Sequence, residues 1–138
     1  FTGQGATADY ENSTTSGFNG GTKDIKIVSP PDWLIYIPYW AANYRLPNPG
    51  YTYLLISIKP SRDGDGFGLH TERVGDAALP AVELSNYGPV PQANVWGSYK
   101  VPLADLGLNS SDTTLYKVVL QSHLTGPNAI EVDAIGFQ

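Results

Sequence analysis

Hydrophobic and polar residues alternate along most of the chain, in short runs separated by turn-forming residues. Alternation with a period of two is typical of β-strands that bury one face and expose the other. The strongest run is Tyr51–Lys59. The pattern predicts about eight or nine strands, over the ranges Ala8–Glu11, Asp24–Val28, Trp33–Trp40, Tyr51–Lys59, Phe67–Val74, Ala81–Ser85, Trp96–Leu103, Leu115–His123 and Ala129–Phe137.

The alternation also predicts which side chains face the core. Along three of these runs the branched aliphatic residues share one side, which we expect to be buried. This inward set is Ile35, Ile37, Leu54, Ile56, Ile58, Val118 and Leu120. The outward set on the same runs is Leu34, Tyr36, Trp40, Tyr53, Leu55, Ser57, Lys59, Lys117, Val119, Gln121 and His123.

Glycine, proline and asparagine mark the connections between the runs. The composition of Leu46–Gly50 and of Asn86–Ala93 predicts loops. Arg62–Gly66 has the Asp-Gly-Asp-Gly composition typical of a hairpin turn, so we expect it to pair Tyr51–Lys59 directly with Phe67–Val74. The whole series predicts an all-β domain built from two packed antiparallel sheets.

Length and composition narrow the possible classes. The 138 residues suffice for a single domain spanning residues 1–138, and no apolar run is long enough for a transmembrane helix. The sequence has no cysteine, which excludes a disulfide framework and thiolate chemistry. With 8 Lys and Arg against 13 Asp and Glu, the net charge is −5, and this acidic balance predicts neither a nucleic-acid nor a membrane partner.

The same composition bears on where the protein works. Few lysines, many Tyr, Gly, Ser and Thr, and no methionine are compatible with a secreted, extracellular protein. Because the chain begins with Phe1, we expect a processed or excised piece of a longer protein.

Local signatures of catalysis do not occur in the sequence. It contains no Gly-x-Ser-x-Gly elbow, no phosphate-binding glycine loop and no His-Glu-x-x-His motif. Its two histidines, His70 and His123, are expected on outward strand faces. Asp63–Gly66 suggests a calcium loop, but the EF-hand pattern fails because Phe67 and Val74 stand where oxygen ligands are required.

Aromatic residues are the most informative candidates for a binding surface. Five of them fall within the twelve residues from Trp33 to Tyr44. Core packing explains any one of these rings equally well, but outward rings beside ammonium and amide groups suit a sugar. Rings stack on the C–H faces of pyranoses, and polar tips bind the hydroxyls. We therefore expect one polysaccharide-binding sheet face that carries Tyr36, Trp40, Tyr53, Lys117 and Gln121, with Tyr44 as a further binding residue.

Three motifs in the last third of the chain carry a family resemblance. Trp96–Gly107 contains Val-Pro-Leu-x-x-Leu, Leu115–Gln121 is a strand that ends in Gln, and Ile130–Phe137 reads apolar-x-Val-Asp-x-Ile-x-Phe. Together with Asp9-Tyr10-Glu11-Asn12 near the N-terminus, they resemble the β-jelly-roll carbohydrate-binding modules of the galactose-binding-like group.

The resemblance implies a two-sheet jelly-roll sandwich and a non-catalytic module that holds a secreted, tethered polysaccharide-degrading enzyme on its substrate. The ligand expected is a neutral plant or fungal wall polysaccharide, a β-glucan such as cellulose most of all, because an acidic surface repels polyuronates. The family often carries a structural calcium ion, at positions that match Glu11 and Asp133, although Ala134 replaces a frequent second acid. The family's tryptophan that matches Trp96 is packed, so Trp96 stays outside the expected site.

Two other functions remain open at this point. A small jelly-roll polysaccharide lyase or glycoside hydrolase would need His70, Arg73 and Tyr53, or a pair of carboxylates, to converge in one cleft. A protein-adhesion β-sandwich would turn the aromatic face toward a protein instead.

Overall fold

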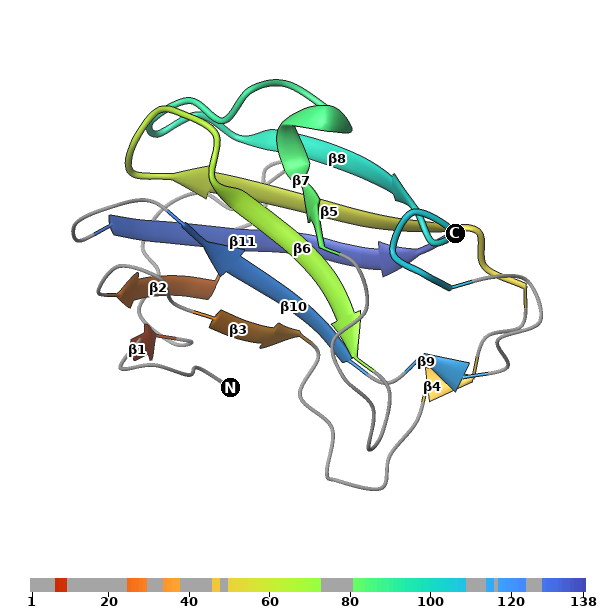
Figure 1. Cartoon of the computed structure of the whole chain (residues 1–138). Coiled ribbons are helices and arrows are strands. Elements are labelled where there is room, and N and C mark those ends of the chain that lie inside the picture. The colour runs from red at the N-terminus through yellow and green to blue at the C-terminus, as the bar shows by residue number, and fades with distance from the viewer. Residues whose placement is uncertain are drawn as a thin grey trace.

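A computed structural model gives the architecture, and it describes residues 7–9, 25–29, 34–37, 46–47, 50–72, 81–108, 114–115, 117–123 and 128–138. Two antiparallel sheets pack face to face (Figure 1), as the alternating pattern predicted. The five-stranded sheet has the order β1 (Thr7–Asp9), β2 (Ile25–Ser29), β11 (Asn128–Phe137), β5 (Tyr53–Pro60) and β8 (Gly97–Pro102). The four-stranded sheet has the order β3 (Leu34–Ile37), β10 (Lys117–Ser122), β6 (Phe67–Glu72) and β7 (Val82–Glu83).

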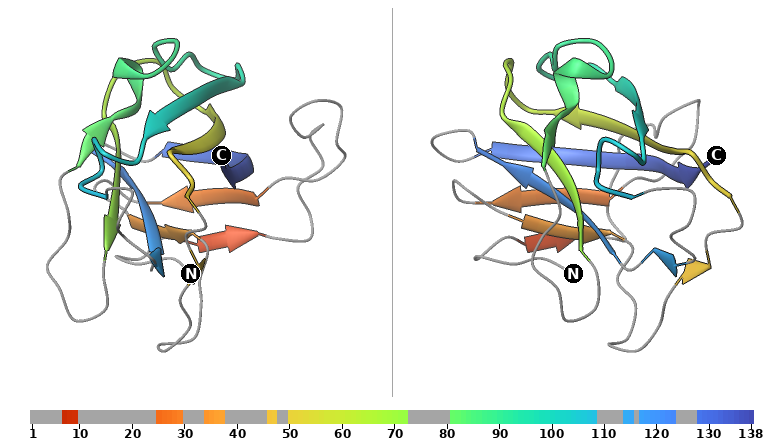
Figure 2. Two further views of the ribbon diagram at one scale, coloured as in Figure 1. Left: turned by 90° about the vertical axis from the view of Figure 1, so that its right-hand side faces the viewer. Right: turned by 45° about the vertical axis from the view of Figure 1, so that its right-hand side comes forward.

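The two sheets form two layers whose strands cross obliquely (Figure 2). A third, small pair of strands, β4 (Leu46–Pro47) and β9 (Thr114–Leu115), lies apart from both sheets. A short 3-10 turn, η2 (Leu84–Asn86), follows β7. No helix in the described ranges is long and apolar enough to cross a membrane.

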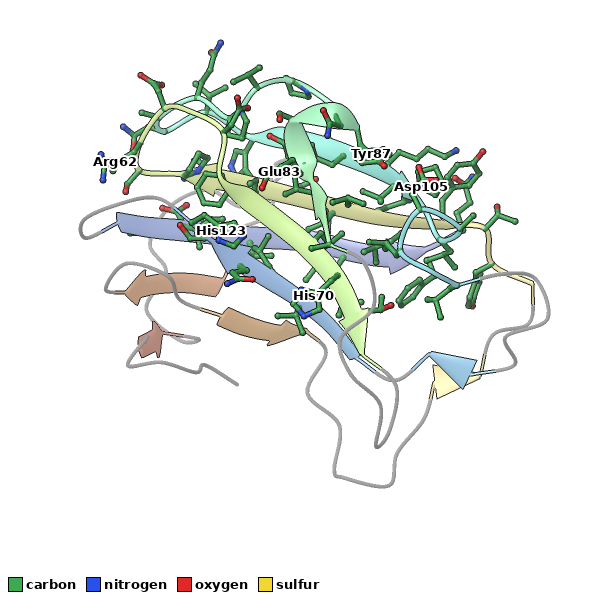
Figure 3. The ribbon with its side chains drawn as sticks, in the orientation of Figure 1. Arg62, His70, Glu83, Tyr87, Asp105 and His123 are labelled. Atoms are coloured by element: carbon green, nitrogen blue, oxygen red, sulfur yellow. The ribbon has the colours of Figure 1, made fainter. Side chains whose placement is uncertain are left out.

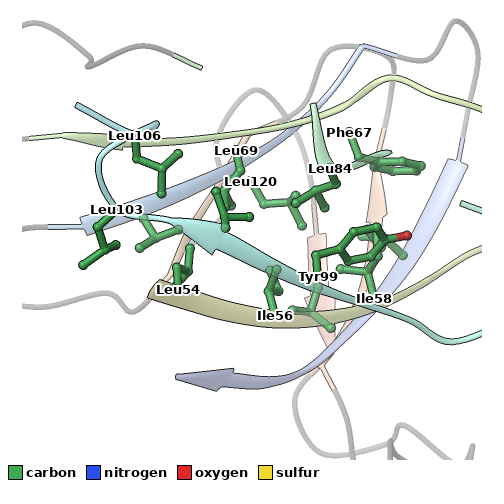
Figure 4. Close-up of a cluster of buried hydrophobic side chains, with 14 of the residues drawn as sticks. Leu54, Ile56, Ile58, Phe67, Leu69, Leu84, Tyr99, Leu103, Leu106 and Leu120 are labelled. Carbon is green, nitrogen blue, oxygen red and sulfur yellow. The ribbon is translucent and has the colours of Figure 1, made fainter. Parts of the chain in front are cut away.

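The core lies between the sheets (Figure 4) and confirms the predicted burial wherever side chains are described. Leu54, Ile56 and Ile58 of β5 are at most 1% exposed, and Val118 and Leu120 of β10 are at most 2% exposed. They belong to one continuous apolar cluster. The backbone register places Ile35 and Ile37 of β3 opposite Leu120 and Val118, and therefore on the inward face as well.

Among the described residues, the largest fully buried side chain is that of Tyr99 of β8, which stands two residues after Gly97 on the inward face. The ring leans back over Gly97, and a Cβ added to that glycine would lie 2.5 Å from the Tyr99 hydroxyl. Among the buried side-chain nitrogen and oxygen atoms of the described residues, only this hydroxyl oxygen has no hydrogen-bond partner. Burial raises the pKa of Tyr99 above its ordinary value, since the phenolate would be desolvated.

The predicted hairpin between β5 and β6 is wrong. β5 pairs with β11 and β8 in one sheet, whereas β6 pairs with β10 and β7 in the other, so residues 61–66 carry the chain across the sandwich. The glycines do make a tight turn, because Gly64 and Gly66 have φ of 117° and 111°. That turn is tied to the loop after η2: the Asp63 carboxylate accepts the Ala93 N–H at 2.7 Å.

The loop predicted over Leu46–Gly50 also contains an element that local composition did not reveal. Leu46 and Pro47 form β4 by pairing with Leu115 and Thr114. A proline is tolerated there because a short strand of this kind has few backbone donors to satisfy.

Candidate functional site

Each sheet has one outer face, and the register assigns residues to it because directly opposed residues share a face. The outer face of the four-stranded sheet is here called the β6–β10 face. One row across it is Leu34, Gln121, Gly68 and Glu83, and the next row is Tyr36, Val119 and His70. Lys117 and Glu72 form the row after these.

Exposure divides the β6–β10 face into a closed part and an open part. Val119 is 0% exposed and His70 is 7% exposed, although both lie on the outer side of the sheet. Gln121 and Glu83 are partly exposed, and His123, one residue beyond β10, is exposed. Among the side chains of this face that the structure describes, the accessible polar groups lie at the Gln121–His123 end, where β6 begins (Figure 3).

Gly68 lies buried at this end of the face, against the His123 ring. A Cβ added to it would lie 3.2 Å from His123 Nε2 and 3.9 Å from Glu83 Oε1, so the imidazole and the carboxylate flank the same point. The backbone of residue 66 fixes both neighbours: the Gly66 N–H donates to Glu83 Oε2 at 3.2 Å, and the His123 N–H donates to the Gly66 carbonyl at 2.7 Å. We call the group Gly68, Glu83, Gln121 and His123 the Gly68 notch.

The outer face of the five-stranded sheet, here the β5–β8 face, is built differently. Two of its described aromatic rings have lysines over them: Lys100 Nζ lies 4.1 Å from the centroid of the Tyr53 ring, and Lys59 Nζ lies 5.2 Å from that of Trp96. Between them, the hydroxyls of Ser57 and Ser98 are 3.0 Å apart and hydrogen-bonded to each other. Ring faces that are covered by the chain's own ammonium groups are poorly placed to stack on a sugar.

A charged pair closes one end of the β5–β8 face. Lys59 of β5 forms an ion pair with Glu131 of β11, directly opposite it in the register, and the two side chains are only 13% and 10% exposed. On the other side of Glu131 the register places Lys26 of β2, which in turn is opposite Asp9 of β1. The ion pair between directly opposed Lys59 and Glu131 stabilises the pairing of β5 with β11.

A second polar contact lies near the far end of β8. The Tyr87 hydroxyl donates to Asp105 Oδ2 at 2.9 Å (Figure 3). Desolvation, together with this hydrogen bond and the carboxylate's charge, raises the pKa of Tyr87 above its ordinary value. The pair is exposed, and its geometry ties the turn after η2 to the turns that follow β8.

The structure separates the residues that were expected to share one binding face. Tyr36, Lys117 and Gln121 do occupy the β6–β10 face by register. The expectation that Tyr53 joins them is wrong, because β5 belongs to the other sheet. Trp40 and Tyr44 lie outside the described residues. Trp96, expected to be packed, is partly exposed beside Lys59.

The same separation removes one proposed catalytic set. His70 lies on the β6–β10 face and Tyr53 on the β5–β8 face, so the core stands between them and they cannot converge in one cleft. Arg73, the third member of that set, lies outside the described residues.

Comparison with known proteins identifies the fold. No protein-family model and no curated protein matches the sequence. A family 30 carbohydrate-binding module matches in structure with a TM-score of 0.64 at 17% identity, over 100% of this chain and 92% of that one. The family 11 carbohydrate-binding module from Clostridium thermocellum, solved in complex with a β-1,3-1,4-mixed-linked tetrasaccharide, matches with a TM-score of 0.57 at 13% identity, over 99% and 85%.

This chain has the fold of these carbohydrate-binding modules. The jelly-roll architecture implied by the sequence resemblance is confirmed. The same fold also occurs inside enzymes: a β-1,2-glucanase from Parabacteroides distasonis matches with a TM-score of 0.61 at 15% identity, over 96% of this chain but only 22% of the enzyme.

Of the two residues expected to hold a calcium ion, only Asp133 lies in the described part of the chain. Asp133 lies on the outer side of β11, partly exposed, and its Oδ1 accepts the Ala134 N–H at 2.6 Å. Ala134 has a φ of 50°, in a bulge where the β5–β11 register shifts. Glu11 lies outside the described residues. Within the described part of the chain, no group of three or more His, Asp or Glu side chains is placed to hold a metal, and the calcium ion stays a prediction.

Three members of the Gly68 notch were not among the expected binding residues: Gly68, Glu83 and His123. Only one local signal pointed to them. A glycine inside an alternating strand pattern often marks a place where another group approaches the backbone closely, and Gly68 interrupts the run that becomes β6.

Proposed function

We propose that this chain is a non-catalytic carbohydrate-binding module that binds a neutral polysaccharide on its β6–β10 face. The observation that carries the proposal is the structural match to a family 30 module over 100% of this chain and 92% of that one. The ligand class we favour is a β-glucan such as cellulose.

The choice of the β6–β10 face follows from the contrast between the two outer faces. On this face Gln121, Glu83 and His123 present an amide, a carboxylate and an imidazole to solvent at one end. On the β5–β8 face the Tyr53 and Trp96 rings are covered by lysines, and the serine hydroxyls bond to each other. Groups that satisfy one another have less to offer a sugar, since binding must first break their contacts.

Aromatic stacking forms the finer part of the proposal. Tyr36 stands in the row next to Gln121 on the β6–β10 face, and we assign stacking to Tyr36 together with Trp40 and Tyr44, with Lys117 as a polar contact. A neutral glycan suits such a face better than a polyuronate, because the chain carries a net charge of −5.

The biological setting belongs to the same proposal. We place the module, as a single domain, in a secreted protein in which a tethered catalytic domain degrades the bound polysaccharide, with a structural calcium ion held by Glu11 and Asp133. A carboxylate supplies the hard oxygen that calcium prefers. Occurrence of the fold within a much longer β-1,2-glucanase supports the tethered arrangement.

An NMR titration of the labelled chain with mixed-linkage β-glucan oligosaccharide tests both the ligand and the face. We expect shifts in the backbone amides of Gly68, Gln121 and His123, since these flank the open end of the β6–β10 face. The amides of Ser98 and Lys100, on the β5–β8 face, should stay in place.

The reverse pattern, with Ser98 and Lys100 shifting alone, would reject the assigned face but keep a glycan-binding module. No shift anywhere at millimolar oligosaccharide would reject the β-glucan ligand. Cleavage of the oligosaccharide during the titration would favour the alternative of a small lyase or hydrolase.

A further inference from the structure

The Gly68 notch has a geometry that none of the strands alone would create. Gly68 stands between Gln121 and Glu83 in one row of the sheet. Because Gly68 has no side chain, the His123 imidazole packs close to its backbone, with Nε2 3.2 Å from the position that a Cβ would take. The imidazole, the carboxylate and the amide thus come from two strands and the residue after β10, and they lie around the buried backbone of Gly68.

The hydrogen-bonding capacity of the notch is only partly used within the described residues. Glu83 Oε2 accepts the Gly66 N–H, which anchors the carboxylate. Glu83 Oε1, which points toward Gly68, accepts no hydrogen bond from the described residues. The His123 ring likewise has no such partner there, whereas its backbone N–H is bonded to Gly66. An anchored carboxylate with one oxygen left is a strong acceptor for a hydroxyl.

From this arrangement we infer that the Gly68 notch is a sugar subsite that binds a pair of adjacent hydroxyls on one pyranose residue of the glycan. The inference rests on the proposed function and deepens it. One hydroxyl donates to Glu83 Oε1, and its neighbour bonds to His123 Nε2 or to the Gln121 amide. Gly68 allows this arrangement, because a Cβ at that position would lie only 3.2 Å from His123 Nε2 and would push the imidazole away from the carboxylate.

The chemistry separates this subsite from the stacking part of the face. Stacking depends on the C–H surface of the sugar and tolerates blocked hydroxyls, whereas the notch requires hydroxyl protons to donate. A glycan whose hydroxyls are methylated keeps its apolar surface but loses those donors. The wild-type chain should therefore prefer cellotetraose over fully O-methylated cellotetraose, and the notch should account for the preference.

The decisive variant is Glu83→Gln. The glutamine oxygen still accepts the Gly66 N–H, and the amide NH2 then replaces the acceptor that faces Gly68. We expect affinity for cellotetraose, measured by isothermal titration, to fall about tenfold, since hydrogen bonds to charged groups are the stronger ones. The preference over the methylated sugar should shrink by a similar factor. His123→Ala and Gly68→Ala should each weaken binding several-fold.

Matched controls come from exposed residues elsewhere. Asp105→Asn changes an exposed carboxylate that is hydrogen-bonded to Tyr87, and Gln92→Ala removes an exposed amide, and both should bind as the wild type does. If Gly68→Ala fails to fold in a melting curve, Glu83→Gln and His123→Ala still decide the question.

The possible failures can be told apart. If wild-type chain binds cellotetraose and Glu83→Gln and His123→Ala bind it equally well, the subsite is wrong while the module stands. If the wild type binds neither cellotetraose nor any other neutral glucan, both the subsite and the proposed function are wrong. Unchanged preference over the methylated sugar in Glu83→Gln would also overturn the subsite.

Discussion

Replacing Glu131 by leucine should lower the free energy of unfolding by about 3 kcal/mol, as breaking a buried ion pair does. Glu131 and Lys59 are 10% and 13% exposed and directly opposed on β11 and β5, the central strands of the five-stranded sheet. The substitution leaves the Lys59 ammonium beside the Trp96 ring without its carboxylate partner. Urea denaturation of the two proteins measures the difference.

A variant without either charge distinguishes the effect of the unpaired charge on stability from the effect of altered side-chain packing. In Lys59→Met/Glu131→Leu the Lys59 ammonium is no longer left without its carboxylate, and part of the lost stability should return. Asp105→Ala, which breaks an exposed hydrogen bond to Tyr87, should cost well under about 1 kcal/mol. If Glu131→Leu alone costs no more than Asp105→Ala, the pair is effectively solvated and our account of this row is wrong.

A methyl group at Gly97 should destabilise the domain by roughly 2–3 kcal/mol. The added Cβ would lie 2.5 Å from the Tyr99 hydroxyl and 3.0 Å from its Cζ, and the ring is 2% exposed in the core and has little room to move. Gly136→Ala is the matched strand control, because a Cβ there meets nothing within 4 Å. Thermal melts of Gly97→Ala and Gly136→Ala compare the two directly.

The Tyr99 hydroxyl supplies the internal check. Tyr99→Phe removes both the closest contact and a buried polar atom without a partner, so alone it should be neutral or stabilising, and it should partly rescue Gly97→Ala. The stability of Tyr99→Phe relative to the wild type should also increase as the pH rises past about 10, where the tyrosine of an unfolded chain ionises. Burial raises the pKa of Tyr99 in the folded state, so ionisation at high pH favours the unfolded wild-type chain and lowers its free energy of unfolding. No rescue by Tyr99→Phe would contradict the assigned contact.

Alternation in the sequence predicted the buried sides of the strands but not their partners. Leu54, Ile56 and Ile58 face the core as expected, because a period of two is a property of a single strand. Which sheet a strand joins depends on pairing with distant segments. Arg62–Gly66 has hairpin composition, yet β5 and β6 find their partners in β11 and β10, so they part into different layers.

The same limit applied to the site. Outward parity correctly placed Gln121 on an outer face, but parity cannot distinguish the two outer faces, and Tyr53 was therefore assigned to the wrong one. The lysine over the Tyr53 ring comes from β8, far along the chain. Glu83 and His123 meet at Gly68 only because β7 and β10 flank β6. Such convergence has no local signature in the sequence.

The central claim is that the chain binds a neutral glucan and does not cleave it. Affinity electrophoresis of the wild-type chain in native gels containing mixed-linkage β-glucan, hydroxyethylcellulose or polygalacturonate, with reducing ends assayed in parallel, tests it most directly. We predict retardation by the neutral glucans, unchanged mobility in polygalacturonate and no new reducing ends. Equal mobility in all three gels, or release of reducing sugar from either glucan, would contradict the account.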